Sequence, residues 1–483
     1  TMTTTSEATP LVQDQQATTT STASTPWLVR VGAAAAVVVG GIVLYTAFRT
    51  TPTTAPATAT AASLTFCDAT VKHEFGYIQL PHKVDDHYFY SFFESRNDPT
   101  TDPLVIWLEG GPGSSSTWAL LNANGPCTIN AELNGTTPNP YSWTTNANVI
   151  WLDQPTGVGF SYGDATDDDS NEIDVGRNVY GFLQGWLKQH PQFQSNPFFI
   201  TGQSYGGHYV PAAANYIVHE QAKAALAPDA IRINLQGIAI GNGITDTVIQ
   251  FPSAVGIAEA NAYNITLVTP AELTKLKQDA ARMESLLIQC QAPNETQACL
   301  DAANMIGDLL TPMVQNPTRD PYDIRNTCDP PACIYPDMAN TETFLNRPDV
   351  QAILGVHKAY QWNNQTVAEA FTIDVVKSAV GFVPKVLAAG VRVLIYAGDA
   401  DLMCPWNGNE AWTKKLEWPH KKTFNAASVL PLTVAGKHAG EVRSSQGLSF
   451  VRVYNSGHGV TMDQPAVGLA LLDRFLRNAS LDH

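Results

Sequence analysis

One serine stands in a sequence context that is typical of a catalytic nucleophile. Ser204 lies between Gly202 and Gly206, shortly after the apolar run 197–201. The pattern predicts a buried strand, a sharp turn that carries the serine, and a helix that begins at Tyr209. Glycines at the two flanking positions leave room for the chain to double back, so that the hydroxyl is exposed above the sheet edge. We therefore expect a nucleophile elbow.

Two later loops carry the partners that a serine nucleophile needs. A base must take the proton of the hydroxyl, and a carboxylate must orient that base. Asp401 follows the expected strand 391–397, and His458 follows the expected strand 450–454, so the chain order is serine, acid, histidine. We expect Ser204, Asp401 and His458 to form a catalytic triad.

Short apolar runs alternate with helical patterns along most of the chain. Such alternation predicts an α/β fold with a mostly parallel sheet and helices on both faces. From about 246 to 345 the strand pattern fades, and the amphipathic run 271–290 indicates an inserted helical cap over the carboxyl edge of the sheet, where ligands of open α/β sheets bind. The expected strands are 87–93, 104–108, 149–152, 198–201, 238–240, 391–397 and 450–454, and the expected helices include 175–189 and 209–225.

The first 62 residues differ from the rest of the chain. Residues 1–26 are rich in Thr, Ser and Gln and have too few apolar side chains to fold. Within 27–49, about 18 mostly apolar residues reach the lower limit for a membrane-spanning helix, and 50–62 form a Thr/Pro/Ala stalk. We expect an uncleaved signal-anchor over 27–49, then the stalk and a folded domain over 63–483. A cleaved signal peptide, which would make the protein secreted, is the alternative.

The charge balance excludes several classes of partner. The chain carries 28 basic and 44 acidic residues, a net charge of −16. An acidic domain argues against nucleic acid as a partner and suits an acidic compartment. The sequence contains no G-x-x-x-x-G-K-[ST] phosphate loop, no H-E-x-x-H zinc motif and no paired C-x-x-C. We expect neither a metal nor an organic cofactor.

Cysteines and glycosylation sequons indicate the secretory route. Seven reduced thiols in a cytosolic enzyme are the alternative, which five N-x-[ST] sequons disfavour. We place the folded domain in the lumen of the secretory pathway, the vacuole or lysosome, or outside the cell. The expected disulfides are Cys67–Cys127, Cys290–Cys299 and Cys328–Cys333, with Cys404 as the free thiol. The sequons, each expected to carry a glycan, are Asn134, Asn264, Asn294, Asn364 and Asn478.

Further motifs make the chain similar to the serine carboxypeptidase family over roughly residues 63–480. The resemblance implies an α/β-hydrolase fold and hydrolysis of the last peptide bond of a chain, usually at acidic pH. It implies Ser204 as nucleophile, His458 as base and Asp401 as the orienting acid. Peptide or protein C-termini would be the partners, and a homodimer is allowed. The matching segments are 94–99, 107–113, 139–143, 152–155, 159–162, 241–243 and 322–325.

The resemblance also implies roles for residues around the triad. The backbone N–H groups of Gly111 and Tyr205 would form the oxyanion hole, and losing one such donor typically costs about 3 kcal/mol in the transition state. Glu109, Gly110 and Gln203 would hold the substrate carboxylate.

The same family pattern bears on two residues near the triad acid. It places the acid at the second Asp of Gly-Asp-x-Asp, which leaves Asp399 a structural role. Cys404 matches a position beside the acid that often carries an unpaired thiol, which accounts for the odd cysteine.

Several positions depart from the family pattern. The family normally has Asn, Glu and Glu where this chain has Glu109, Ala123 and Gln203. Because acid and amide have exchanged places, we expect Glu109 to bond Gln203 and substrate binding to take up a proton. Ser114 replaces a cysteine, so a disulfide between this loop and the cap is absent. Gly459 replaces a bulky residue, which should widen the pocket for the leaving residue.

We expect a serine-type carboxypeptidase that works through an acyl-enzyme on Ser204. An acyltransferase or esterase that keeps the triad is the alternative, because the carboxylate-binding positions depart from the family pattern. A protective scaffold glycoprotein is a second alternative, against which the intact triad argues.

Overall fold

The computed structural model describes residues 66–223, 229–315, 317–328 and 337–483. The expected tail, signal-anchor and stalk, 1–62, lie outside the described residues and stay predictions. Within the described part of the chain, no helix is both long and apolar enough to cross a membrane.

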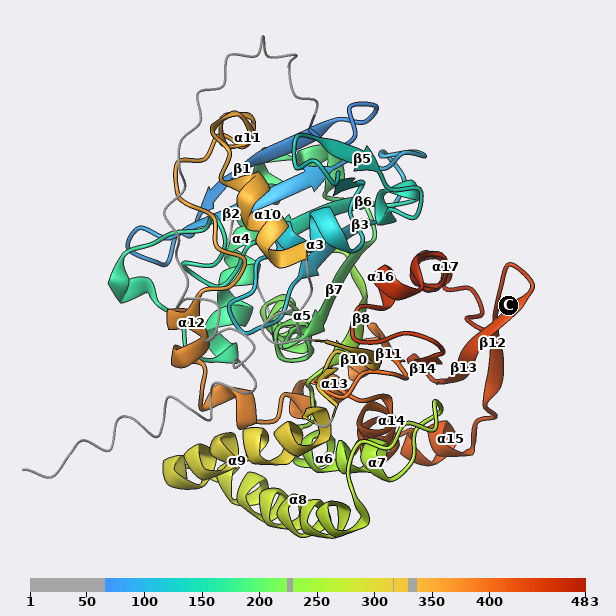
Figure 1. Ribbon diagram of the computed structural model, residues 1–483. Helices are drawn as coiled ribbons and strands as arrows, with labels where there is room; N and C mark the ends of the chain where they lie inside the picture. The colour runs from blue at the N-terminus through green and yellow to red at the C-terminus, as the bar shows by residue number, and fades with distance from the viewer. Residues whose placement is uncertain (1–65, 224–228, 316, 329–336) are drawn as a thin grey trace, which may run out of the picture.

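A ten-stranded sheet forms the centre of the molecule (Figure 1). Its six central strands, from β6 to β14, run parallel, and an antiparallel pair extends the sheet at each edge. The expected α/β fold class is confirmed. In spatial order the strands are β1 (His73–Gln79), β2 (His87–Phe93), β6 (Asn148–Leu152), β3 (Leu104–Leu108), β7 (Phe198–Ser204), β8 (Leu235–Gly243), β11 (Arg392–Gly398), β14 (Leu448–Val453), β13 (Lys437–Ser445) and β12 (Leu430–Val434).

The central strands are buried on both faces, as expected of a parallel sheet that is covered by helices. Successive side chains of a strand point to opposite faces, so Ile106 of β3 packs into one core and Trp107 into the other. On the Ile106 side lie α4 (Glu172–Gln189), α5 (Gly206–Gln221) and α13 (Val383–Ala388), and on the Trp107 side lie α3 (Ser116–Asn122), α10 (Asp337–Leu345), α11 (Pro348–Leu354) and α17 (Pro465–Leu476).

Helices fill the long connection between β8 and β11, where the strand pattern fades. The pair α8 and α9 packs side by side at one end of the molecule (Figure 1). Thr269 and Glu272 form a reciprocal capping box at the start of α8. Before α10 this stretch holds α6 (Thr247–Ser253), α7 (Val255–Glu259), α8 (Pro270–Cys290), α9 (Thr296–Val314) and the two-stranded β9 (Arg319–Asp320) with β10 (Asp323–Thr327).

Helices also follow 345, the expected end of the cap. α11 follows this position, whereas α10 still lies within the expected cap range. Both helices lie against the Trp107 face of the sheet rather than over its carboxyl edge. α5 begins at Gly206, three residues before the expected start, and ends at Gln221, short of the expected 225. The remaining helices are α12 (Gln365–Ala370), α14 (Trp406–Lys415), α15 (Lys421–Ala426) and α16 (Val460–Asp463).

Two of the expected disulfides are present. Cys67–Cys127 ties the start of the described domain to the hairpin of β4 (Cys127–Ile129) and β5 (Thr136–Pro138), and Cys290–Cys299 joins α8 to α9. Cys404 is free and buried. Cys333 lies outside the described residues, so its pairing with Cys328 stays a prediction.

Candidate active site

The turn after β7 has the geometry of a nucleophile elbow. Ser204 ends the strand with φ +59°, in the left-handed region that non-glycine residues rarely occupy. A Cβ atom at Gly202 would lie 2.4 Å from the carbonyl oxygen of Leu108, and one at Gly206 would lie 2.9 Å from the same atom. The two glycines therefore let β7 and α5 pass close to β3, which raises the serine above the sheet edge.

The histidine and one acid meet beside this elbow. Nδ1 of His458 lies 2.8 Å from Oδ2 of Asp401, and both side chains are buried. Since Asp401 accepts at Nδ1, the neutral imidazole keeps Nε2 as its basic nitrogen. Burial by itself lowers the pKa of His458, but the charges of Asp401 and other nearby carboxylates raise it above its ordinary value. The pair can therefore take and return a proton.

The acid of this pair is Asp401, and its neighbour Asp399 has other partners. The carboxylate of Asp399 accepts hydrogen bonds from Arg452, at 3.1 Å, from Tyr263, and from the backbone N–H of Asn455. Asp399 is thus committed to an ion pair on the far side of the turn, which agrees with the structural role expected for it.

A glycine-rich loop after β3 lies against the nucleophile. A Cβ atom at Gly110 would be 2.5 Å from the backbone nitrogen of Tyr205 and 2.7 Å from Cβ of Ser204, so no side chain fits there. Gly111 follows with φ +109°. Tyr205 immediately precedes the first turn of α5, where unpaired N–H groups and the helix dipole favour negative charge. The loop and the helix start can together stabilise an oxyanion beside Ser204.

Glu109 and Gln203 form a buried pair next to the same loop. Nε2 of Gln203 donates to Oε1 of Glu109 at 3.0 Å, which is the bond expected from the exchange of acid and amide. Nε1 of Trp107 donates to Oε2 at 3.0 Å, and the N–H of Gly110 reaches Oε1 at 3.2 Å. Burial raises the pKa of Glu109 despite these three donors. A titrating carboxyl group therefore stands within the expected carboxylate site.

The comparisons with known proteins agree with this geometry. A family model described as serine carboxypeptidase matches residues 64–478. The chain belongs to the serine carboxypeptidase family. Carboxypeptidase Y homolog A of Trichophyton equinum is 38% identical over 420 residues, which cover 85% of this chain and 75% of that protein. Serine carboxypeptidase-like 47 of Arabidopsis thaliana is 38% identical over 408 residues, covering 84% and 78%.

The fold is similar to that of a solved carboxypeptidase. The crystal structure of Kex1Δp, a prohormone-processing carboxypeptidase from Saccharomyces cerevisiae, superimposes with a TM-score of 0.74. The match covers 84% of this chain and 91% of that one at 24% identity, so it speaks for the fold alone.

In this carboxypeptidase, two further residues hold the Asp401–His458 pair in place. Both lie in segments that the sequence analysis named without giving these residues a role. Nδ2 of Asn242 donates to Asp401 at 2.9 Å, and its Oδ1 accepts from the N–H of Gly398 at 2.9 Å. The carbonyl oxygen of Tyr322 accepts from the backbone N–H of His458 at 2.8 Å, and the two rings lie edge to face at 5.0 Å. Both residues belong to motifs that the chain shares with the family, and this shared pattern is the sequence signal that could have identified them.

The expected widening beside Gly459 is offset by a neighbour. A Cβ atom at Gly459 would lie 2.9 Å from the sulfur of Met462, so the methionine occupies part of the space that a bulkier residue would take. Cys404, the free thiol, also lies at the site. Its N–H donates to Asp401 at 3.1 Å, and its side chain is within hydrogen-bond reach of Ser204.

Four of the five sequons present an exposed asparagine, and the fifth does not. Asn364 is half-buried, and its Nδ2, the atom that would carry a glycan, donates to the carbonyl oxygen of Gly157 at 3.0 Å. A glycan would replace one of the two hydrogens of this nitrogen at a half-buried position, and glycosylation at Asn364 stays a prediction. The exposed asparagines are Asn134, Asn264, Asn294 and Asn478.

Proposed function

We propose that this carboxypeptidase releases C-terminal residues from peptides at acidic pH, through an acyl-enzyme on Ser204. The observation that carries the proposal is that two pairs of side chains lie close to one nucleophile. The Asp401–His458 pair can move the proton of the serine, and the buried Glu109–Gln203 pair lies beside the loop that contacts Ser204. The first pair suits acyl transfer, and the second suits recognition of a carboxylate.

In the proposed reaction, the hydroxyl oxygen of Ser204 attacks the carbonyl carbon of the last peptide bond, and Nε2 of His458 takes the hydroxyl proton. The C–N bond then breaks, and His458 gives this proton to the leaving amine. A water molecule attacks the acyl-enzyme while His458 takes one of its protons. The proton returns to the serine oxygen as the ester bond breaks, leaving a free amino acid and a peptide shortened by one residue.

The oxyanion of each tetrahedral intermediate would accept from the backbone N–H groups of Gly111 and Tyr205. Such preorganised donors stabilise charge that develops only in the transition state. Gly110 supports this role because its lack of a side chain allows the loop to approach Tyr205.

Acidic pH suits the proposed binding of the substrate carboxylate. Gln203 offers N–H donors at every pH, whereas Glu109 donates only when it is protonated and repels the substrate when it is ionised. Because burial raises the pKa of Glu109, the protonated form extends to higher pH than in an exposed glutamate. Substrate binding should therefore take up a proton, and KM should rise with pH.

We further propose that the catalytic domain works in the lumen of the secretory pathway, in a vacuole or lysosome, or outside the cell. Two disulfides support an oxidising compartment. Four exposed sequons agree with passage through the glycosylation machinery.

One assay tests the proposal directly. Hydrolysis of a blocked dipeptide is compared with that of its C-terminal amide and ester from pH 4 to 7, with Ser204→Ala as the inactive control. The free acid should be favoured over the amide by about tenfold or more, since a hydrogen bond to a charged group contributes about 1.5–3 kcal/mol. Equal rates on acid and amide would favour the esterase or acyltransferase alternative, and absence of fluorophosphonate labelling at Ser204 would favour the scaffold.

A further inference from the structure

The oxyanion loop, residues 110–115, has little to fix its own shape. Gly111 and Gly113 have φ values of +109° and +90°, and glycine loses more conformational freedom on folding than any other residue. Within the loop, the N–H of Ser114 donates to the carbonyl oxygen of Gly110 at 3.1 Å. No disulfide can hold the loop, because Ser114 stands where the family carries a cysteine. Its position must depend on contacts from elsewhere.

A distant segment, residues 362–364, makes those contacts. Ser114 and Asn363 form an antiparallel β-bridge, and Nδ2 of Asn363 donates to Oγ of Ser114 at 3.0 Å and to the carbonyl oxygen of Pro112 at 3.1 Å. The N–H of Ser115 donates to the carbonyl oxygen of Trp362 at 2.8 Å. These two residues of the segment thus bond the loop at three of its six residues, and Oγ of Ser115 also donates to Asp153 at 2.6 Å.

The next residue extends the contact to a second loop. The N–H of Asn364 donates to the carbonyl oxygen of Gly113 at 2.9 Å. Its Nδ2 donates to the carbonyl oxygen of Gly157, and its Oδ1 accepts from the N–H of Thr366 at the start of α12. One asparagine therefore joins the oxyanion loop, the loop after β6 and a helix start.

We propose that Asn363 and Asn364 are positioning residues for the oxyanion hole and replace a covalent link with hydrogen bonds. They act through the loop and do not touch the substrate, so their loss should move Gly111 relative to Tyr205. A displacement of about 1 Å can cost about 100-fold in rate. A second consequence is that Asn364 stays unglycosylated in active enzyme, because a sugar on its half-buried Nδ2 would displace the adjacent loop at Gly157.

Two substitutions of Asn363 test the proposal. Asn363→Asp keeps the shape and replaces the donor with a carboxylate that faces the carbonyl of Pro112, and Asn363→Ala removes the side chain. Both should lower kcat by about 10- to 100-fold with KM for a blocked dipeptide nearly unchanged. Asn425→Ala is the matched control, because Asn425 donates to the carbonyl of Lys414 far from the site.

The outcomes separate positioning from folding. Retained thermal unfolding temperature together with a lower kcat supports the proposal. A kcat in Asn363→Asp equal to that of the control overturns it, whatever the effect of Asn363→Ala. Mass spectrometry of protein from a eukaryotic host should find the peptide with Asn364 unmodified, and a glycan there on active enzyme overturns the role of Asn364. A protein inactive on all substrates would instead contradict the proposed function.

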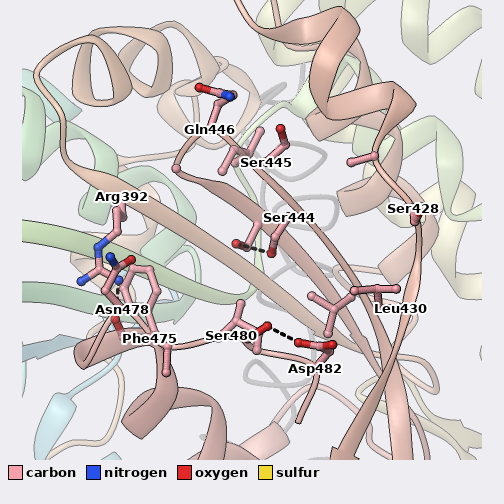
Figure 2. Close-up of a pocket in the computed structure, with 17 residues that line it drawn as sticks. Arg392, Ser428, Leu430, Ser444, Ser445, Gln446, Phe475, Asn478, Ser480 and Asp482 are labelled. Carbon is pink, nitrogen blue, oxygen red and sulfur yellow. Dashed lines mark hydrogen bonds between the residues drawn. The ribbon is translucent and has the colours of Figure 1, made fainter.

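A cavity at the amino ends of the parallel strands, opposite the end that carries the active site, supports an independent inference. It has a volume of about 360 Å³ and is lined by residues at the starts of β11 and β14 (Figure 2). Asp401 and His458 follow the other ends of these two strands. Its lining is rich in hydrogen-bonding side chains next to an aromatic ring. Among the residues that line it are Arg392, Ser444, Ser445, Gln446, Phe475 and Asn478.

The chemistry of this lining suits a sugar. Hydroxyl, amide and guanidinium groups can bond sugar hydroxyls and an N-acetyl group. The guanidinium of Arg392 lies over the ring of Phe475 at 4.8 Å from its centroid, so the two form a common surface. Ser444 donates to Ser449 at 2.7 Å, which shows that hydroxyls gather on one wall.

The chain itself can supply the sugar. Asn478 is the sequon asparagine of Asn478-Ala479-Ser480, is exposed, and lines the cavity from the end of α17. None of the other four sequon asparagines lines this cavity. We infer that the first sugar residues of an N-linked glycan on Asn478 occupy the cavity. The tether gives a high effective concentration, so weak contacts suffice. This inference depends on the proposed passage through the secretory pathway.

Site-resolved deglycosylation tests the inference. Folded protein from a eukaryotic host is treated with an N-glycan-removing enzyme, and release at each asparagine is followed by mass spectrometry. The glycan on Asn478 should be released more slowly than those on Asn134, Asn264 and Asn294, and the difference should vanish after denaturation. Equal release from the folded protein overturns the inference. Absence of a glycan at Asn478 alone also overturns it, whereas absence at all sites contradicts the proposed compartment.

Discussion

The two halves of the active site are held in place in different ways. Asp401 accepts hydrogen bonds from the N–H groups two and three residues later in its own loop, and it bonds His458 directly. The oxyanion loop 110–115 is held instead by the segment 362–364, with a sequence separation of 251 between Asn363 and Pro112. In the acid–base half, bonds from its own loop and from His458 and Asn242 thus converge on one carboxylate, whereas in the oxyanion half a distant segment holds the backbone of a loop. Activity should therefore be lost when a single side chain of the acid–base half is replaced. In the oxyanion half, activity should be lost when the segments that contact the loop are displaced.

The largest effect is expected in the acid–base half. Asp401→Asn should lower kcat on a blocked dipeptide by about four orders of magnitude, because the imidazole loses the carboxylate that orients it. Asp399→Asn is the matched control in the same turn. It weakens the ion pair with Arg452 and should reduce thermal stability while most of the kcat remains. Equal losses of kcat in both variants would contradict the assignment of Asp401.

In the oxyanion half, the addition of a single methyl group should be enough to lower kcat. Gly110→Ala places a Cβ atom 2.5 Å from the backbone nitrogen of Tyr205, so the loop must move away from the nucleophile. We expect kcat to fall by about 100-fold. Gly381→Ala is the control, since a Cβ atom there meets nothing within 4 Å. Steady-state kinetics that fail to distinguish the two variants would refute the close contact between loop and elbow.

A smaller effect is expected at the boundary between the halves, where Glu109 lies. As pH rises, Glu109 ionises and repels the substrate carboxylate, so KM should rise with a slope of no more than one proton. Glu109→Gln should flatten this rise and leave ester hydrolysis nearly unchanged, because an ester lacks the carboxylate. KM measured from pH 4.5 to 7 decides the matter. A KM that is independent of pH in the unmodified enzyme would remove Glu109 from substrate binding.

The smallest effect concerns stability away from both halves. Burial raises the pKa of Asp86 to about 7, and the nearby carboxylate of Asp169 adds to the rise. A carboxyl group whose pKa is higher in the folded than in the unfolded state binds a proton on folding. Its stabilisation is complete below pH 4 and is lost as pH rises to about 7. The melting temperature should fall over this window.

Asp86→Asn should make that fall shallower, because the amide does not titrate. Thr156 would keep an acceptor in the amide oxygen, so the hydrogen bond at this position is retained. Melting curves of the two proteins from pH 4 to 7.5 provide the measurement. If the melting temperatures of the two proteins fall in parallel with pH, Asp86 does not contribute to the pH dependence of stability.

Local patterns in the sequence were enough to place the elbow, the loops that carry Asp401 and His458, and the seven buried strands. Each depends on residues close together along the chain, such as the glycines around Ser204 or the apolar run before Asp401. The pattern did not reveal β1, β12 or β13. β1 and β13 have largely exposed or half-exposed side chains, and β13 is mostly polar, so neither has the apolar run that marks a buried strand.

Contacts between distant segments could be predicted only where the sequence marked both partners. The bond between Glu109 and Gln203 was expected because the two positions had exchanged acid and amide. No such signal marked Asn363, whose importance lies only in its position opposite Ser114. The sequon at Asn364 predicted an exposed asparagine, yet the side chain is half-buried and donates to the carbonyl oxygen of Gly157. A local motif describes what a residue can do, and only packing decides which of its atoms are free.

The buried thiol of Cys404 has a consequence for how the enzyme survives and can be observed. Thiols are oxidised and alkylated as thiolates. Burial and the adjacent charge of Asp401 raise the pKa of Cys404, which keeps its sulfur protonated and unreactive while it is buried. An unpaired cysteine can therefore persist in an oxidising compartment. The rate at which a thiol reagent labels Cys404 in unreduced protein then reports how often this buried thiol becomes accessible, without any substrate being present.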